Sequence, residues 1–165
     1  MINTTTPEET NTPYAADSVV VMETNIDDMN PQDFQILQER LFAAGALDVF
    51  FTSIMMKKMR PGTMLTCIGP VDRREMLGEM ILRHSSSIGV RWRVSERMTL
   101  RRSFMTFSSS FGEITLKLST WGNEVVRVTP EYDDLHRMSQ DTGLPVGEIR
   151  SRILGEYYAQ NKTGE

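Results

Sequence analysis

The chain has 165 residues and a mass of 18.8 kDa, which is enough for one compact domain or two small lobes. Its single cysteine, Cys67, cannot form an internal disulfide, so a disulfide-framed secreted module is excluded and a reducing cytoplasm is favoured. The formal net charge of −4 argues against a general nucleic-acid coat, and no apolar run approaches the roughly 18 residues of a membrane-spanning helix. We therefore expect a cytoplasmic protein with no nucleic-acid and no membrane partner.

The charges fall into three zones along the chain. Residues 1–39 hold eight acidic and no basic side chains, residues 40–102 hold twelve basic and five acidic ones, and residues 103–165 hold six basic and nine acidic ones. An acidic segment beside a basic one is typical of a site that joins a cation to a phosphate ligand. Ordinary solvated surface charge produces the same distribution, so the zones alone leave both interpretations open.

The N-terminal part of the chain is expected to become ordered near Ser18. Residues 1–17 lack hydrophobic periodicity and are rich in Thr, Asn and Pro, which is typical of a disordered leader or linker. A run of valines predicts a strand over 18–22. Asn30 and Pro31 then have the order of an N-cap and a first helical residue, so we expect a helix from there to Gly45.

The following elements are predicted from alternating hydrophobic residues, turn residues and helical periodicity. They are a strand at 47–57, a turn at 60–62, a strand at 64–68, a helix at 71–84 and a strand at 88–98. The resulting order over 18–98, β-α-β-β-α-β, is that of a ferredoxin-like fold. We therefore predict an α+β protein whose first lobe is ferredoxin-like.

The remainder, residues 99–165, is predicted to form a smaller α/β lobe. It contains three strands and two helices, at 103–111, 113–119, 124–128, 131–141 and from Pro145 onward. Gly143 follows the first of these helices at the position where a left-handed residue commonly ends a helix. This lobe is thus expected to be β-rich and closed by two helices.

Three carboxylates form the first candidate site. Glu23, Asp27 and Asp28 occur between a predicted strand and a predicted helix with no basic residue among them. Such carboxylates repel one another unless a cation relieves the repulsion, and Mg²⁺ or Mn²⁺ prefers carboxylate and phosphate oxygens. We predict that these three residues hold a divalent metal, and the alternative is a solvated turn stabilised by the helix dipole.

A basic turn forms the second candidate site. Lys57, Lys58 and Arg60 supply positive charge, and Gly62 and Thr63 allow close backbone approach and hydroxyl donation. Such a turn suits a di- or triphosphate, although it lacks the pattern of a Walker A loop. A solvated hairpin turn is the alternative.

A third cluster combines small hydroxyl residues with arginines. Residues 85–87 are three serines, followed by Gly89 and Arg91, and further arginines alternate along the next strand. Hydroxyl groups and a guanidinium at a helix-to-strand junction suit phosphate or sugar, and we assign Arg91 to phosphate. The sequence assigns no catalytic residue, since no nucleophile motif is present.

Five ordered segments together are similar to a known family. They are Glu23-Thr-Asn-Ile-Asp-Asp-Met29 with Pro31, Gly45-Ala-Leu-Asp-Val-Phe50, Met56-Lys-Lys58 with Arg60-Pro-Gly62, Ser87-Ile-Gly-Val-Arg91 and Pro130-Glu-Tyr132. From about Val20 to its end, the chain resembles the C-terminal domain of LarC, the nickel-insertion family of the lactate racemase cofactor pathway. Two positions depart from this resemblance. Met59 occupies a position where the resemblance leads us to expect Asn or Gly, and Thr129 occupies one where it leads us to expect Lys.

The resemblance implies a CTP-dependent nickel chelatase of the lyase class. Such an enzyme inserts Ni²⁺ into pyridinium-3,5-bisthiocarboxylic acid mononucleotide, forming the nickel-pincer nucleotide, while CTP yields CMP and pyrophosphate. It also implies CTP binding with Mn²⁺ or Mg²⁺ and assembly into homo-oligomers. The family's larger N-terminal domain is missing here, so a separate nickel-binding partner is expected for activity.

Two other classes of function remain open. A ferredoxin-like lobe also serves as a regulatory module that binds a small ligand without catalysis. It also serves as an assembly subunit that binds no ligand. Nucleotide binding and turnover distinguish these classes from a chelatase.

Overall fold

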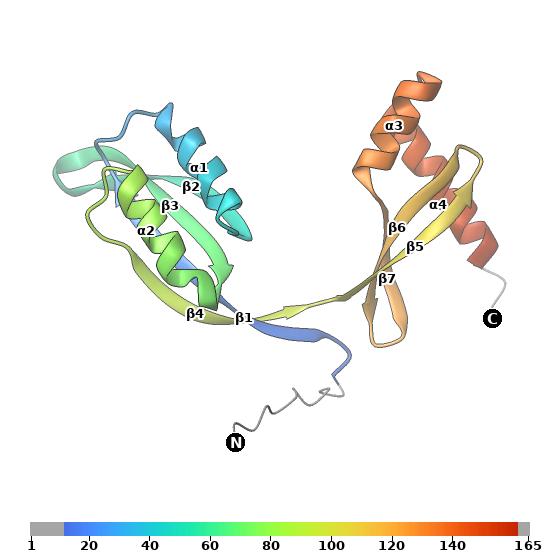
Figure 1. Ribbon diagram of the computed structural model, residues 1–165, viewed down its shortest axis with the longest axis horizontal. Coiled ribbons are helices and arrows are strands. Elements are labelled where there is room, and N and C mark those ends of the chain that lie inside the picture. Colours follow the sequence, from blue (N-terminus) through green and yellow to red (C-terminus); the bar gives the residue numbers. More distant parts are fainter. Residues whose placement is uncertain (1–11, 162–165) are drawn as a thin grey trace. The chain divides into compact units, whose positions relative to one another are not determined.

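The computed structural model describes residues 12–161, and these form two compact units (Figure 1). The N-terminal unit comprises residues 16–97. The C-terminal unit comprises residues 98–161 together with 12–15. Most of the expected leader, residues 1–11, lies outside the described residues.

The N-terminal unit is a four-stranded sheet with two helices on one face. Its elements are β1 (Ala15–Ile26), α1 (Asp33–Ala43), β2 (Asp48–Met56), β3 (Arg60–Pro70), α2 (Arg74–His84) and β4 (Arg91–Thr99), with short 3₁₀ turns at Lys57–Met59 and Val71–Arg73. The strand order is β2-β3-β1-β4, and β3 pairs antiparallel with both β1 and β2. Figure 1 shows α1 and α2 on the same side of this sheet. The predicted α+β, ferredoxin-like architecture is confirmed.

The core of this unit lies between the sheet and the two helices. Alternate residues of β1 and β3 face the stripes of α1 and α2, with Leu37, Leu41, Leu77 and Ile81 fully buried. Cys67 is fully buried in the same core, and burial raises the pKa of its thiol to about 11. Its predicted role as a small buried hydrophobe is confirmed, because such a thiol stays protonated and unreactive.

Strand β1 is longer than predicted at both ends. It begins at Ala15 rather than Ser18 and ends at Ile26 rather than Met22. Residues 15–17, which were expected in the leader, therefore belong to the sheet, and Asp17 forms an ion pair with Arg97 at 2.6 Å. Hydrophobic periodicity detects only the buried middle of a strand. Backbone pairing continues into polar segments at both ends, and these segments have no such periodicity.

The turn between β2 and β3 lies three residues earlier than predicted. Lys58 and Met59 have φ values of 60° and 57°, whereas Pro61 and Gly62 are part of β3. Gly62 is needed for close packing and not for a turn, since an added Cβ would lie 2.9 Å from the carbonyl oxygen of Ile26. The Pro61-Gly62 pair was therefore wrongly predicted to form a turn, whereas Gly62 is required for close packing within β3.

Replacing Met59 with Gly is expected to stabilise the protein. Met59 has a positive φ in the three-residue connection between Met56 and Arg60, a backbone conformation in which a residue with a Cβ is strained and Gly is not. Gly removes the backbone strain at this position, but its greater conformational entropy in the unfolded chain offsets part of that gain. We therefore expect the free energy of unfolding to rise by about 0.5–1 kcal/mol. Urea unfolding measures this gain. Met59→Ala keeps the Cβ, and an equal gain in that variant would contradict the explanation.

The C-terminal unit is a three-stranded sheet followed by two helices. Its elements are β5 (Arg101–Ser109), β6 (Gly112–Trp121), β7 (Glu124–Pro130), α3 (Tyr132–Thr142) and α4 (Val146–Asn161), and the strand order is β5-β6-β7. Its core contains Leu116, Leu135, Ile149 and Ile153, all fully buried. Gly143, with φ of 72°, ends α3 as predicted. Among the described residues, no helix has the length and apolar character needed to cross a membrane.

Candidate functional site

The loop that follows β1 is the centre of the candidate site. It connects the buried Ile26 to α1, and its tight path is fixed by Asn30, whose side chain accepts a hydrogen bond from the Gln32 N–H at 3.1 Å. The Asn30 carbonyl accepts from the Asp33 N–H at 3.0 Å, so α1 begins at Asp33, later than Pro31 predicted. Because the loop is short, Asp27 and Asp28 are held beside the ends of the neighbouring strands.

A polar cavity of about 400 Å³ lies beside this loop. It is lined by Thr24, Asn25, Asp27, Asp28, Ser86, Ser87, Ile88, Gly89 and Arg91. Side-chain hydroxyls organise its serine-rich wall, since Ser85 Oγ donates to the Ile81 carbonyl at 2.7 Å and Ser87 Oγ donates to the Gly89 carbonyl at 2.9 Å. The cavity therefore combines carboxylates, hydroxyls and a guanidinium.

Thr24 anchors the serine-rich wall to β1. Its side chain is buried, its hydroxyl donates to the Gly89 carbonyl at 2.8 Å, and it also contacts Ser87 Oγ. Thr24 was not among the predicted site residues, because the residues after Met22 were expected to form a loop. An extended strand through Ile26 would have placed Thr24 on the same face as the buried Met22 and Ile26.

Arg91 is held at the edge of the polar cavity by two side chains of β1. Its Nε donates to Glu23 at 3.1 Å, and its terminal nitrogen donates to Asn25 Oδ1 at 3.1 Å. Arg93 forms a second ion pair with Glu23 at 3.3 Å, and only 17% of the Glu23 side chain is exposed. Glu23 thus orients two arginines from within the strand.

The three predicted metal ligands are not brought together. Glu23 is engaged by Arg91 and Arg93, Asp27 pairs with Arg60 at 3.3 Å, and Asp28 is exposed. Within residues 12–161, no group of three or more Asp, Glu, His or Cys side chains is arranged to hold a metal ion. The physical reason is that β1 continues through Glu23, which separates this carboxylate from the loop. Only Asp27 and Asp28 border the polar cavity.

The predicted phosphate ligands are also divided. Arg91 lines the polar cavity, and Arg60 reaches its edge through the ion pair with Asp27. Lys57 and Lys58 are exposed in the β2–β3 turn and are not part of the cavity wall. Thr63 lines a different, apolar cavity. The five residues predicted to hold the triphosphate therefore do not line one shared cavity.

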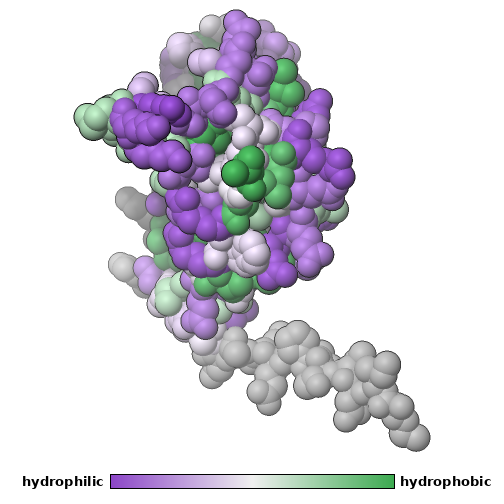
Figure 2. All heavy atoms as spheres, turned by 90° about the vertical axis from the view of Figure 1, so that its left-hand side faces the viewer, coloured by the Kyte–Doolittle hydropathy of each residue, from purple (hydrophilic) through white to green (hydrophobic). Residues whose placement is uncertain are grey.

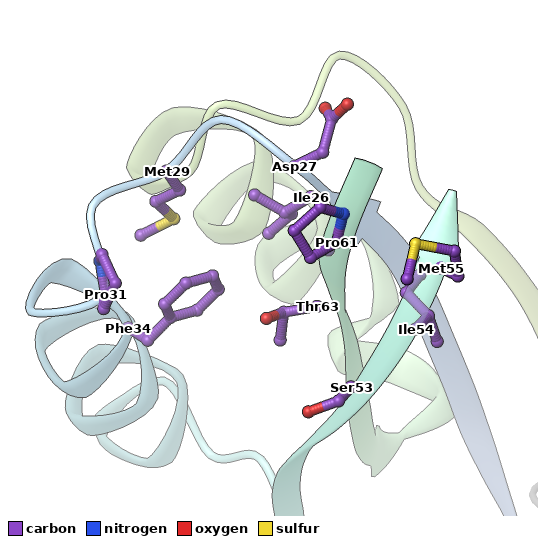
Figure 3. Close-up of a pocket in the computed structure, with 11 residues that line it drawn as sticks. Ile26, Asp27, Met29, Pro31, Phe34, Ser53, Ile54, Met55, Pro61 and Thr63 are labelled. Carbon is purple, nitrogen blue, oxygen red and sulfur yellow. The ribbon is translucent and has the colours of Figure 1, made fainter. Parts of the chain in front are cut away.

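The apolar cavity has a volume of about 630 Å³ and lies between the start of α1 and the β2–β3 hairpin (Figure 3). It is lined by Ile26, Asp27, Met29, Pro31, Phe34, Ser53, Ile54, Met55, Pro61, Gly62 and Thr63. Figure 2 shows the side of the N-terminal unit that lies to the left in Figure 1, where hydrophobic residues gather in a patch bordered by hydrophilic ones. Asp27 lines both the apolar and the polar cavity.

Comparison with known proteins assigns the chain to a family. A family model described as "Nickel insertion protein" matches residues 1–150. The chain is 38% identical over 130 residues to the pyridinium-3,5-bisthiocarboxylic acid mononucleotide nickel insertion protein of Thermotoga sp. (strain RQ2), covering 79% of this chain and 32% of the relative. It is 36% identical over 137 residues to the protein of the same name from Acetivibrio thermocellus, covering 83% and 33%. The chain thus spans about a third of the length of these curated relatives.

Two solved structures resemble the chain. The apo form of LarC2, the C-terminal domain of a cyclometallase involved in the synthesis of the NPN cofactor of lactate racemase, matches with a TM-score of 0.78 and 34% identity, covering 85% of this chain and 96% of that structure. Protein MK0293 of Methanopyrus kandleri AV19 matches with a TM-score of 0.64 and 22% identity, covering 82% and 86%, and shares the fold. The chain therefore belongs to the LarC nickel insertion protein family and corresponds to its C-terminal domain.

Proposed function

We propose that this chain is the metal–CTP-binding part of a nickel chelatase that inserts Ni²⁺ into pyridinium-3,5-bisthiocarboxylic acid mononucleotide. The observation that carries the proposal is the polar cavity in which Asp27, Asp28 and Arg91 converge. Similarity to relatives named for that nickel insertion supports the substrate. Nickel and the mononucleotide are substrates in this proposal, and CTP is the energy source that yields CMP and pyrophosphate.

The polar cavity has the groups that a triphosphate requires. Arg91 is already oriented by Glu23 and Asn25, so its guanidinium binds a phosphate with little further loss of side-chain freedom. The hydroxyl of Ser86 also lines this cavity and supplies a neutral donor, while Ser87 is held in the wall by its bond to the Gly89 carbonyl. Fixed donors of this kind stabilise charge on transferring phosphoryl groups.

Two carboxylates at the cavity fit a small divalent cation. Mg²⁺ usually binds through one or two carboxylates plus substrate phosphate oxygens, and Mn²⁺ accepts the same hard oxygen ligands. We assign Asp27 and Asp28 to this ion, and Glu23 to the orientation of Arg91. A bound Mn²⁺ or Mg²⁺ would neutralise phosphate charge in the cavity. Arg60, now paired with Asp27, is placed to transfer to the phosphates when the cation takes that carboxylate.

The remaining basic residues and the partners complete the proposal. Lys57 and Lys58, at the exposed hairpin turn, are proposed to approach the outer phosphates, and Thr63 is reassigned to the apolar cavity that it lines. The part of the family's proteins that this chain does not cover is proposed to act as a separate nickel-binding partner. We also propose that the chain forms homo-oligomers, which light scattering measures directly.

Asp28→Asn tests the metal assignment. Since Asp28 is exposed and has no ion-pair partner among residues 12–161, we expect the stability of the apo protein to change by no more than about 0.5 kcal/mol. The variant loses a hard anionic ligand, so the affinity for CTP in the presence of Mn²⁺ should fall toward the metal-free value. Calorimetric titrations of CTP at several Mn²⁺ concentrations, with urea unfolding of the apo protein, measure both effects.

Asp33 provides the matched control for this variant. Asp33 lies in the first turn of α1, where the helix dipole interacts favourably with a carboxylate. It does not line the polar cavity. Asp33→Asn should therefore cost about 0.3–1 kcal/mol of stability and leave the Mn²⁺ dependence unchanged. If Asp28→Asn behaved like this control, Asp28 would not be a metal ligand.

A further inference from the structure

We infer that the apolar cavity binds the positively charged pyridinium ring of the mononucleotide substrate. The inference rests on the proposed function, because that function names the substrate. It goes further by assigning a place in this chain to the ring. The cavity lies beside the loop that bears Asp27, and Asp27 also lines the polar cavity proposed for CTP.

The walls of the cavity suit a flat aromatic ring. Phe34 lines the cavity while its ring packs edge-on against Phe51, with 5.2 Å between ring centroids and an interplanar angle of 74°. Figure 3 shows the Phe34 ring and the Met29 side chain beside the same open space. Aromatic faces attract cations, and methionine sulfur contacts aromatic rings favourably, so both groups favour a ring that carries positive charge.

The polar groups of the cavity suit the substituents of that ring. Ser53 and Thr63 are directly opposite each other in the β2–β3 register and lie on the same face of the sheet. Ser53 is exposed and Thr63 is half-buried, so both hydroxyls are accessible to a ligand in the cavity. Two adjacent hydroxyls donate readily to an anionic carboxylate or thiocarboxylate at the edge of a ring.

Asp27 lies at the border between the two cavities. Its side chain is only 18% exposed and lines both cavities, so it carries negative charge at their shared border. That charge is already paired with Arg60, and the proposed metal would take it in the CTP complex, so we assign the preference for a pyridinium cation over the neutral cytosine ring to the Phe34 ring. A mononucleotide in the apolar cavity would therefore lie next to the triphosphate proposed for the polar one.

The test uses a pair of probes that differ in ring charge. Oxidised nicotinamide mononucleotide carries a pyridinium cation, and its reduced form carries a neutral dihydropyridine ring of the same size. With ¹³C-methyl methionine labelling of the whole chain, we expect the oxidised probe to shift the Met29 and Met55 resonances and to bind roughly fivefold more tightly than the reduced probe. The buried Met22 and Met138, which do not line this cavity, report on non-specific changes.

Variants then assign the effect to the cavity. Phe34→Leu should weaken the oxidised probe roughly fivefold and abolish the difference between the two probes, while CTP with Mn²⁺ still binds within about twofold. Phe42→Leu changes an exposed phenylalanine of the same helix outside the cavity, and it should leave both probes unaffected. Thr63→Val preserves the shape of the side chain and provides an independent test if Phe34→Leu does not fold. This variant should bind a carboxylated probe, nicotinic acid mononucleotide, more weakly than the unchanged protein does.

The outcomes separate this inference from the proposed function. If CTP alone shifted Met29 and Met55 and Phe34→Leu weakened CTP, the cavity would belong to the nucleobase and the inference would be overturned. Equal affinity for the oxidised and reduced probes would also overturn it. Pyridinium binding that persists without any binding of CTP and Mn²⁺ would instead refute the proposed function and leave the cavity assignment standing.

Discussion

CTP together with Mn²⁺ is expected to raise the melting temperature of this chain more than ATP, GTP or UTP does. A ligand at about 100 times its Kd stabilises the folded state by roughly 2.7 kcal/mol, which for a protein of this size corresponds to a shift of roughly 5–10 °C. The phosphates account for the stabilisation common to all nucleotides, through Arg91 and the serine-rich wall. The additional shift with CTP follows from the proposed use of that nucleotide.

A thermal-shift panel of the four nucleotides, with and without Mn²⁺, measures this expectation. Equal shifts for all four would refute base specificity and retain phosphate binding. No shift with any nucleotide would favour an assembly subunit that binds no ligand. A shift specific for CTP without formation of CMP, even with the mononucleotide substrate, nickel and the family's N-terminal part present, would favour a regulatory module.

Arg91→Ala is expected to weaken CTP binding roughly 10- to 100-fold. Hydrogen bonds from a charged group are worth about 1.5–3 kcal/mol, and Arg91 is oriented toward the polar cavity by Glu23 and Asn25 before any ligand arrives. The variant also removes one of the two ion pairs of Glu23, so some loss of stability accompanies the loss of affinity. Calorimetry of CTP with Mn²⁺ measures the affinity, and urea unfolding measures the stability.

Arg93→Ala is the matched control for this prediction. Arg93 forms the other ion pair with Glu23, at 3.3 Å compared with 3.1 Å for Arg91, but it does not line the polar cavity. The two variants should therefore lose similar stability, whereas only Arg91→Ala should lose affinity for CTP. Equal losses of affinity would mean that Arg91 acts through the sheet and not on the phosphates.

Several residues that line the two cavities were selected from the sequence, although their grouping was not predicted. The polar residues at 23–28, 57–63 and 85–91 were selected because carboxylates, bases and small hydroxyls have distinct chemistry. Residue type indicates which groups have the chemistry to bind a cation or a phosphate. It does not reveal which of them share a cavity, because that depends on strand pairing over more than sixty positions, as between Glu23 and Arg91.

Glu23 illustrates this limit. In the sequence it is close to Asp27 and Asp28, and a loop containing all three would have made a metal site. In the structure, β1 extends to Ile26, and the alternating pleat directs Glu23 toward Arg91 and Arg93. Thr24 was missed for the same reason, since its role comes from contacts with Ser87 and Gly89 in the loop between α2 and β4.

The sequence by itself determined the order of the elements, the two helical stripes of the ferredoxin-like unit and the family, because periodicity and local motifs are properties of neighbouring residues. The tertiary structure decided where β1 ends, which side of the β2–β3 hairpin bears Thr63, and that Asp27 borders two cavities. These features depend on register and on the packing of α1 against the sheet. Both are set by contacts between residues far apart in the chain, which no local pattern records.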